Sequence, residues 1–138
     1  MYDFTYEVTL RIFHPNADPN EICEKLGRQA IIKWKAGEKR IVGGHQVNIV
    51  NKNTFCCFNL PHEHNLELVD FLRQTNADLY IYKVFFNSIR QSGGKAEYFI
   101  GWFSDVNSGQ VFDYTFLNEL VDLGIELSLD IYGSSFNK

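Results

Sequence analysis

The last third of the chain constrains the fold most, because residues 95–133 contain a strand, an amphipathic helix and a second strand in succession. Residues 97–103 are mainly aromatic and apolar, which is typical of a buried strand. Apolar residues then recur at helical spacing from Phe116 to Leu123, and residues 125–131 alternate between apolar and polar side chains. Such a unit buries its apolar surfaces only against further strands, so we expect the preceding residues to supply a sheet.

The first half of the chain predicts most of that sheet. Residues 4–12 alternate strictly and indicate a strand with one buried face. Asp18 and Pro19 are typical of the start of a helix, and Gly27 is typical of its end. Further elements are expected at residues 29–36 (strand), 37–44 (charged loop), 47–50 and 54–60 (strands joined by a turn at 51–53) and 65–77 (helix).

Residues 79–89 carry aromatic or aliphatic side chains on both faces of an extended chain, which predicts a long central strand. Gln91 to Gly94 would then form a hairpin turn into the strand at residues 95–104. The fold class predicted is α+β, with a single mainly antiparallel sheet and about three helices packed on one face. We expect one domain over residues 1–138, with a frayed tail at 134–138.

Composition narrows the class of protein. The formal net charge is −4 and the pI is about 5.5, so a nucleic-acid partner is not predicted. No apolar run reaches the roughly 20 residues of a membrane span, and the first thirty residues lack a signal-peptide pattern. Three cysteines, two of them adjacent, do not indicate a disulfide framework. These features indicate a cytoplasmic protein.

Three stretches resemble the bacterial domain-of-unknown-function family numbered 4279. They are LRIFHPNADPNEICEKLG (residues 10–27), KWKAGEKR (33–40) and LVDLGIELSLDIYG (120–133). Members of that family share a first strand, a short helix, a glycine-containing loop and a terminal strand. The resemblance implies a small, cytoplasmic bacterial protein without an established activity, and it implies no catalytic residues.

One segment contains side chains that could bind a metal or act as a nucleophile. His62, His64 and Cys56 are the weak candidates for zinc ligands, with Cys57 and His45 nearby in the sequence. Cys56 or Cys57 beside His45 or His64 could instead form a thiol nucleophile and its base. The spacing matches no known zinc motif, and no phosphate or dinucleotide loop is present, so we predict no metal, no cofactor and no enzymatic activity.

Two surfaces are candidates for binding. The first is a basic patch that consists of Lys33, Lys35, Lys39 and Arg40. It could bind an acidic protein or a nucleic acid, or it could be a solvated loop and edge strand. Trp34, which lies among these residues in the sequence, is expected to pack inward. Alternation also places polar and aromatic side chains on the sheet face away from the helices. The binding surface predicted there consists of Tyr80, Tyr82, Glu126, Asp130 and Tyr132.

The leading hypothesis is a non-enzymatic binding module that covers a partner protein with this sheet face, as an immunity protein covers the basic site of a toxin. One alternative is a small enzyme or zinc-binding protein that uses Cys56, Cys57, His62 and His64. A second alternative is a homodimer formed through the same face. The partner, whether another protein or a second copy, is not identified by the sequence.

Overall fold

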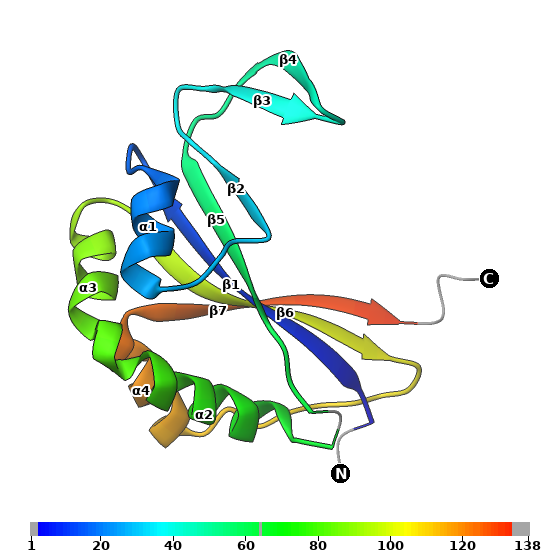
Figure 1. The fold of residues 1–138 in the computed structure, drawn as a ribbon. Helices are drawn as coiled ribbons and strands as arrows, with labels where there is room; N and C mark the ends of the chain where they lie inside the picture. The colour runs from blue at the N-terminus through cyan, green and yellow to red at the C-terminus, as the bar shows by residue number, and fades with distance from the viewer. Residues whose placement is uncertain (1–2, 64, 134–138) are drawn as a thin grey trace.

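The computed structural model describes residues 3–63 and 65–133 and has an α+β fold. A five-stranded sheet forms its centre, in the order β2-β5-β1-β6-β7 (Figure 1). These strands are β1 (Thr5–His14), β2 (Ile32–Trp34), β5 (Thr54–Leu60), β6 (Lys95–Ser104) and β7 (Ile125–Gly133).

The sheet is mixed. β1 pairs antiparallel with β5 and β6, and β2 pairs antiparallel with β5, but β6 and β7 run parallel. The single mainly antiparallel sheet predicted from the sequence is therefore wrong in this respect. The reason is the helix between β6 and β7, because a crossover of that kind returns the chain in the same direction.

A second, two-stranded sheet also departs from the prediction. β3 (Lys39–Val42) and β4 (His45–Val50) form a hairpin that projects beyond the end of β5, away from the helices (Figure 1). Residues 37–44 were predicted as a loop, and β4 was predicted to pair with β5. Gly43 and Gly44 have φ angles of 58° and 81°, the left-handed values that a two-residue hairpin turn requires, so β4 folds back on β3 instead.

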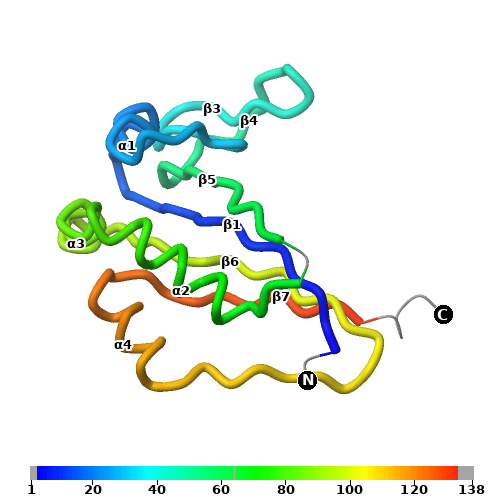
Figure 2. Tube along the Cα trace, turned by 60° about the horizontal axis from the view of Figure 1, so that its bottom comes forward, coloured from blue at the N-terminus to red at the C-terminus, as the bar shows by residue number. Residues whose placement is uncertain are grey.

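Within residues 3–63 and 65–133, four helices cover one face of the sheet (Figures 1 and 2). Asp18 caps α1 by accepting a hydrogen bond from the backbone N–H of Asn20, and Gly27 ends that helix at φ 62°. Asp113 caps α4 in the same way through the N–H of Phe116. The helices are α1 (Pro19–Leu26), α2 (Leu68–Leu79), α3 (Lys83–Gln91) and α4 (Tyr114–Leu123).

The long strand predicted at residues 79–89 is absent. A 3-10 turn, η1 (Tyr80–Tyr82), leads from α2 directly into α3. Phe86 and Ile89 are buried one helical turn apart, whereas Ile81 and Val84 are exposed. A continuous apolar run fits a buried strand and a helix equally well by periodicity, and here the helix is the correct interpretation. Residues 92–94 consequently join a helix to β6 rather than closing a hairpin.

The core lies between the sheet and the helices. Alternate residues of β1, including Val8, Leu10 and Ile12, are buried against helical residues such as Leu72, as the alternation at residues 4–12 predicts. In the part of the chain that the structure describes, no helix is long and apolar enough to cross a membrane.

Candidate binding surface

The opposite face of the five-stranded sheet carries none of the helices, and we call it the open face. Its members follow from the strand registers, since residues directly opposite one another across a pair of strands point to the same side. They are Ile32 and Trp34 of β2; Phe55, Cys57 and Asn59 of β5; Thr5, Glu7, Thr9, Arg11 and Phe13 of β1; Lys95, Glu97, Phe99, Gly101 and Phe103 of β6; and Glu126, Ser128, Asp130 and Tyr132 of β7.

An aromatic cluster occupies one end of the open face. The ring of Phe55 lies 5.0 Å from that of Phe13 and 4.7 Å from that of Trp34, measured between centroids. The guanidinium carbon of Arg40, from β3, lies 4.7 Å from the centre of the Trp34 ring. The prediction that Trp34 packs inward is wrong, because Trp34 lies half-buried on the open face, where the base of the β3–β4 hairpin covers part of its ring.

Arg11 lies near the middle of the open face, between two aromatic rings. Its guanidinium carbon is 3.6 Å from the centre of the Phe99 ring and 5.9 Å from that of Phe55. The Nε atom is buried and has no hydrogen-bond partner among the residues that the structure describes. The carboxylate opposite Arg11, that of Glu97, instead forms an ion pair of 3.2 Å with Lys95. The positive charge of Arg11 is therefore held by aromatic faces rather than by an acid.

A second aromatic pair occupies the β7 side. Tyr132 stacks on Phe103 at 4.9 Å, and its hydroxyl donates a hydrogen bond to the carboxylate of Asp130. That bond, and the negative charge of Asp130, raise the pKa of Tyr132. The carboxylates of the open face are those of Glu7, Glu97, Glu126 and Asp130, and its cations are Arg11 and Lys95, so the carboxylates outnumber the cations.

The structure divides the five residues that the sequence predicted as one binding surface. Glu126, Asp130 and Tyr132 lie together on the open face. Tyr80 and Tyr82 belong to η1, on the helical side of the molecule, where Tyr82 packs against the core and Tyr80 is exposed. The open face instead includes Arg11, Phe13 and Phe55, which the sequence analysis did not predict. They could have been found by continuing the alternation of the first strand to residue 13 and by pairing that strand with residues 54–60.

The predicted basic patch is also divided. Lys33 points to the helical side of β2 and donates a 2.7 Å hydrogen bond to the side chain of Asn20. Arg40 covers Trp34 on the opposite side and donates to the side-chain oxygen of Asn51. Lys35 and Lys39 lie at the base of the β3–β4 hairpin. A single cationic surface does not result from this arrangement.

The cysteine and histidine candidates do not converge in the described residues. Cys56 faces the helices, where burial and the neighbouring Cys23 raise its thiol pKa to about 12. Cys57 points to the open face and is also buried. Both ring nitrogens of His62 lie against carbonyl oxygens, those of Tyr6 at 2.7 Å and Glu63 at 3.0 Å. His45 begins β4 in the projecting hairpin, and His64 lies outside the described residues.

The described part of the chain contains no group of three His, Cys, Asp or Glu side chains that could hold a metal ion. Cys56 is also a poor thiolate, because an uncharged thiol is favoured by its burial.

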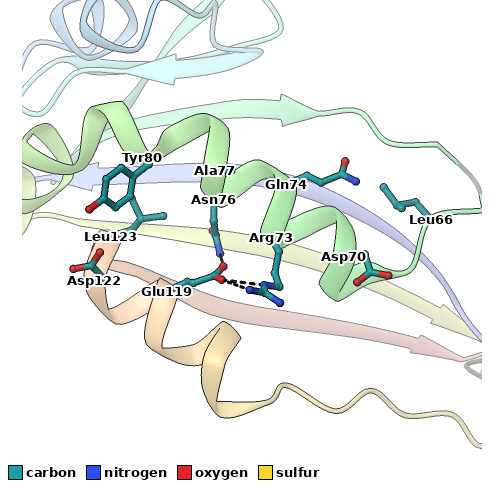
Figure 3. Close-up of a pocket in the computed structure, with 10 residues that line it drawn as sticks. All are labelled: Leu66, Asp70, Arg73, Gln74, Asn76, Ala77, Tyr80, Glu119, Asp122 and Leu123. Atoms are coloured by element: carbon teal, nitrogen blue, oxygen red, sulfur yellow. Dashed lines mark hydrogen bonds and ion pairs between the residues drawn. The ribbon is translucent and has the colours of Figure 1, made fainter.

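A cavity of about 660 Å³ lies between α2 and α4 on the helical side (Figure 3). Arg73 donates hydrogen bonds of 2.9 and 2.7 Å to one carboxylate oxygen of Glu119, and Asn76 donates one of 3.0 Å to the other. Partial burial favours the neutral acid, but these hydrogen bonds and the charge of Arg73 outweigh it, so the pKa of Glu119 is lowered. The sequence analysis did not predict the ion pair between Arg73 and Glu119, although Arg73 and Asn76, which both bind Glu119, lie one turn apart on α2.

Comparison with known proteins adds one finding. The model of a family described as a domain of unknown function (DUF4279) matches residues 4–134. The chain belongs to this family. The DUF4279 match includes every helix and strand from β1 to β7, in agreement with the resemblance noted in the sequence. No curated protein and no solved structure shows a significant match.

Proposed function

We propose that this protein is a non-enzymatic binding protein of the bacterial cytoplasm, of the immunity type, which uses the open face to cover a basic surface of a partner protein. The observation that carries the proposal is the open face itself. It presents aromatic side chains that none of the helices α1 to α4 covers, including Phe103 at 40% and Tyr132 at 43% relative exposure.

Aromatic residues suit this role because they provide a large contact area and lose little conformational entropy on binding. The rings of the open face are already held in place, by stacking between Phe103 and Tyr132 and by a tilted contact between Trp34 and Phe55. A surface that is ordered before it binds loses less free energy on association.

The charges of the open face support a basic partner. Glu126 and Asp130 lie beside the exposed rings on β7, and Glu7 lies opposite Gly101 on the neighbouring strand pair. The whole chain carries a formal net charge of −4, which would steer a positively charged protein toward it.

The experiment is to express the product of the adjacent gene with and without this protein, and to measure binding of the two purified proteins by titration calorimetry. We expect growth arrest by the adjacent product alone, relief on co-expression, and a complex of the two. Replacing both Phe103 and Tyr132 by Ser should weaken binding by about thirtyfold or more, since a hot-spot side chain contributes about 2 kcal/mol or more.

Tyr114→Ser is the matched control, because Tyr114 is an exposed tyrosine on α4, outside the open face. Arrest that co-expression does not relieve, or binding that survives the double replacement but is lost in the Tyr114 control, would refute the proposal.

A further inference from the structure

β7 leaves one edge of the five-stranded sheet unpaired. In residues 3–63 and 65–133, no strand pairs with its outer side. The other edge strand, β2, is only 3 residues long, whereas β7 has 9 residues and runs in unbroken register beside β6. It contains no proline and no lysine. Short strands, bulges, prolines and charged side chains, lysine above all, keep sheet edges from pairing. β7 is long and regular, and its two charged residues, Glu126 and Asp130, both point to the open face.

Apolar side chains lie next to this edge. On the helix-facing side of β7, Leu129 is 43% exposed and Ile131 is 65% exposed. These two residues directly follow the part of β7 that the core covers, since Ile125 is buried and Leu127 packs against the core.

α4, the helix that precedes β7, also carries exposed apolar side chains. Glu119 points toward α2, where it binds Arg73. Residues two positions before and after it, Leu117 and Val121, are turned by about 200° and therefore lie on the flank of α4 away from α2. Both are exposed. α4 leads directly into β7 (Figure 2), and we call the four exposed apolar residues Leu117, Val121, Leu129 and Ile131 the edge strip.

We propose that β7 pairs antiparallel with β7 of a second copy of this chain, which joins the two five-stranded sheets into one and buries the edge strip of both copies. Pairing of this kind closes on itself by a two-fold axis and forms a dimer rather than a filament.

The side chains of β7 select one register for this pairing. All nine residues overlap when the two-fold axis passes beside Leu129, the central residue of the strand. In that register Leu129 lies opposite itself and Leu127 lies opposite Ile131 of the second copy, so apolar side chains meet on one face. On the other face, Asp130 lies opposite Ser128, and Glu126 lies opposite Tyr132.

Shifting the axis by one residue is unfavourable in either direction. An axis beside Ser128 places Glu126 opposite Asp130, and an axis beside Asp130 places that carboxylate opposite its own copy. Like charges directly opposite each other destabilise a strand pair. Full overlap and separation of the acids thus both select the register centred on Leu129, and this agreement is what makes a second copy the occupant.

The dimer is independent of the proposed function, because it uses the edge of the sheet and leaves the open face free. Joining two sheets would extend the open face across the two-fold axis, since the same face of each sheet then points to the same side.

The first test is disulfide cross-linking. In the proposed register the two Cα atoms of residue 129 lie about 4.5–5.5 Å apart, within the range that a disulfide can bridge. Leu129→Cys should therefore form a covalent dimer under mild oxidation. Ser128→Cys is the matched control. In the same register the two copies of residue 128 are diagonal neighbours, about 7–8 Å apart, which is too far for a disulfide. Cross-linking of this variant should therefore not exceed that of the wild-type protein.

The second test is the mass in solution, measured by light scattering. The wild-type protein should have twice the mass of one chain, and Leu129→Lys should halve that mass by placing two cations on the two-fold axis. Val84→Lys, at an exposed apolar residue of α3, should leave the dimer intact.

A wild-type protein that is monomeric at every concentration would overturn the proposal. So would a dimer that cross-links through Ser128→Cys and not through Leu129→Cys, or one that persists in a folded Leu129→Lys variant. If Leu129→Lys does not fold, as judged by circular dichroism, the cysteine variants decide. Loss of partner binding in the Phe103 and Tyr132 double variant, with the dimer retained, would separate this interface from the proposed function.

Discussion

The hydroxyl of Tyr98 donates a 2.7 Å hydrogen bond to the side-chain oxygen of Asn76, inside the core. Asn76 in turn donates to Glu119, so a fully buried tyrosine of β6 is connected to the ion pair between α2 and α4. The low polarity around Tyr98 raises its pKa well above the ordinary value, and the hydroxyl stays neutral. Sheet and helices are thus joined by a polar contact within an otherwise apolar layer.

Removing the Tyr98 hydroxyl should destabilise the fold. Tyr98→Phe leaves the oxygen of Asn76 buried without its donor, and we expect a loss of about 1–3 kcal/mol in the free energy of unfolding. Urea denaturation measures it. Tyr114→Phe, which removes the same atom from an exposed ring, should leave the midpoint unchanged. Equal midpoints for the two variants would show that the buried hydrogen bond contributes nothing.

Stability should fall as the pH is lowered through the ordinary pKa of histidine. His14 is buried, its Nδ1 accepts hydrogen bonds from the backbone N–H of Asn16 and Ala17, and its Nε2 lies 2.8 Å from the Ser92 hydroxyl. Burial lowers the pKa of His14 below its ordinary 6.5. Below that pH the unfolded chain binds a proton that the folded protein does not, so the unfolded state is favoured.

Melting temperatures measured between about pH 7 and pH 5 test this expectation. His14→Gln should be less stable than the wild-type protein at neutral pH but should lose less stability over this range. A wild-type melting temperature that is constant over the range, or a decline that is just as steep in the variant, would contradict it.

Shortening a side chain on the core face of α4 should lower the free energy of unfolding far more than shortening one in the β3–β4 hairpin. Leu120 is buried and Lys39 is exposed. We expect Leu120→Ala to lower the free energy of unfolding by about 2–5 kcal/mol and Lys39→Ala to change it by less than about 0.5 kcal/mol. Denaturant melts of the two variants provide the comparison. Similar losses would mean that the hairpin base, with Arg40 over Trp34, is part of the cooperative core.

Cys56 should resist alkylation in the folded protein. Its thiol is fully buried and its pKa of about 12 leaves almost no thiolate near neutral pH. Mass spectrometry after treatment with iodoacetamide should show label on Cys23, which is partly exposed, and on all three cysteines only after unfolding. Rapid labelling of Cys56 in the native state would favour the thiol-enzyme alternative.

Local signals account for what was predicted correctly. Asp18 and Gly27 mark the two ends of α1 because a side-chain cap and a left-handed glycine act within a few residues. The alternation at residues 4–12 and at 125–131 sets which side chains of β1 and β7 face the helices. For the same reason, Glu126, Asp130 and Tyr132 were correctly assigned to one face.

The errors arose where pairing partners decide the structure. Residues 79–89 have an apolar pattern that both a strand and a helix can bury, and the sequence offers no local signal that separates them. Tyr80 and Tyr82 were placed on the sheet for that reason alone. Glu126, Asp130 and Tyr132 needed no such choice, because β7 is bounded by Gly124 and its sequence alternates throughout.

The sequence by itself determined which face of β1 and β7 is buried and where α1 begins and ends, since these depend on neighbours within one or two turns. Only the tertiary structure decided that β7 runs parallel to β6, that β3 and β4 leave the main sheet, and that Arg11 lies between Phe55 and Phe99. Those contacts join residues far apart in the chain, and many pairings satisfy the same hydrophobic pattern. The packing of the whole chain selects among them.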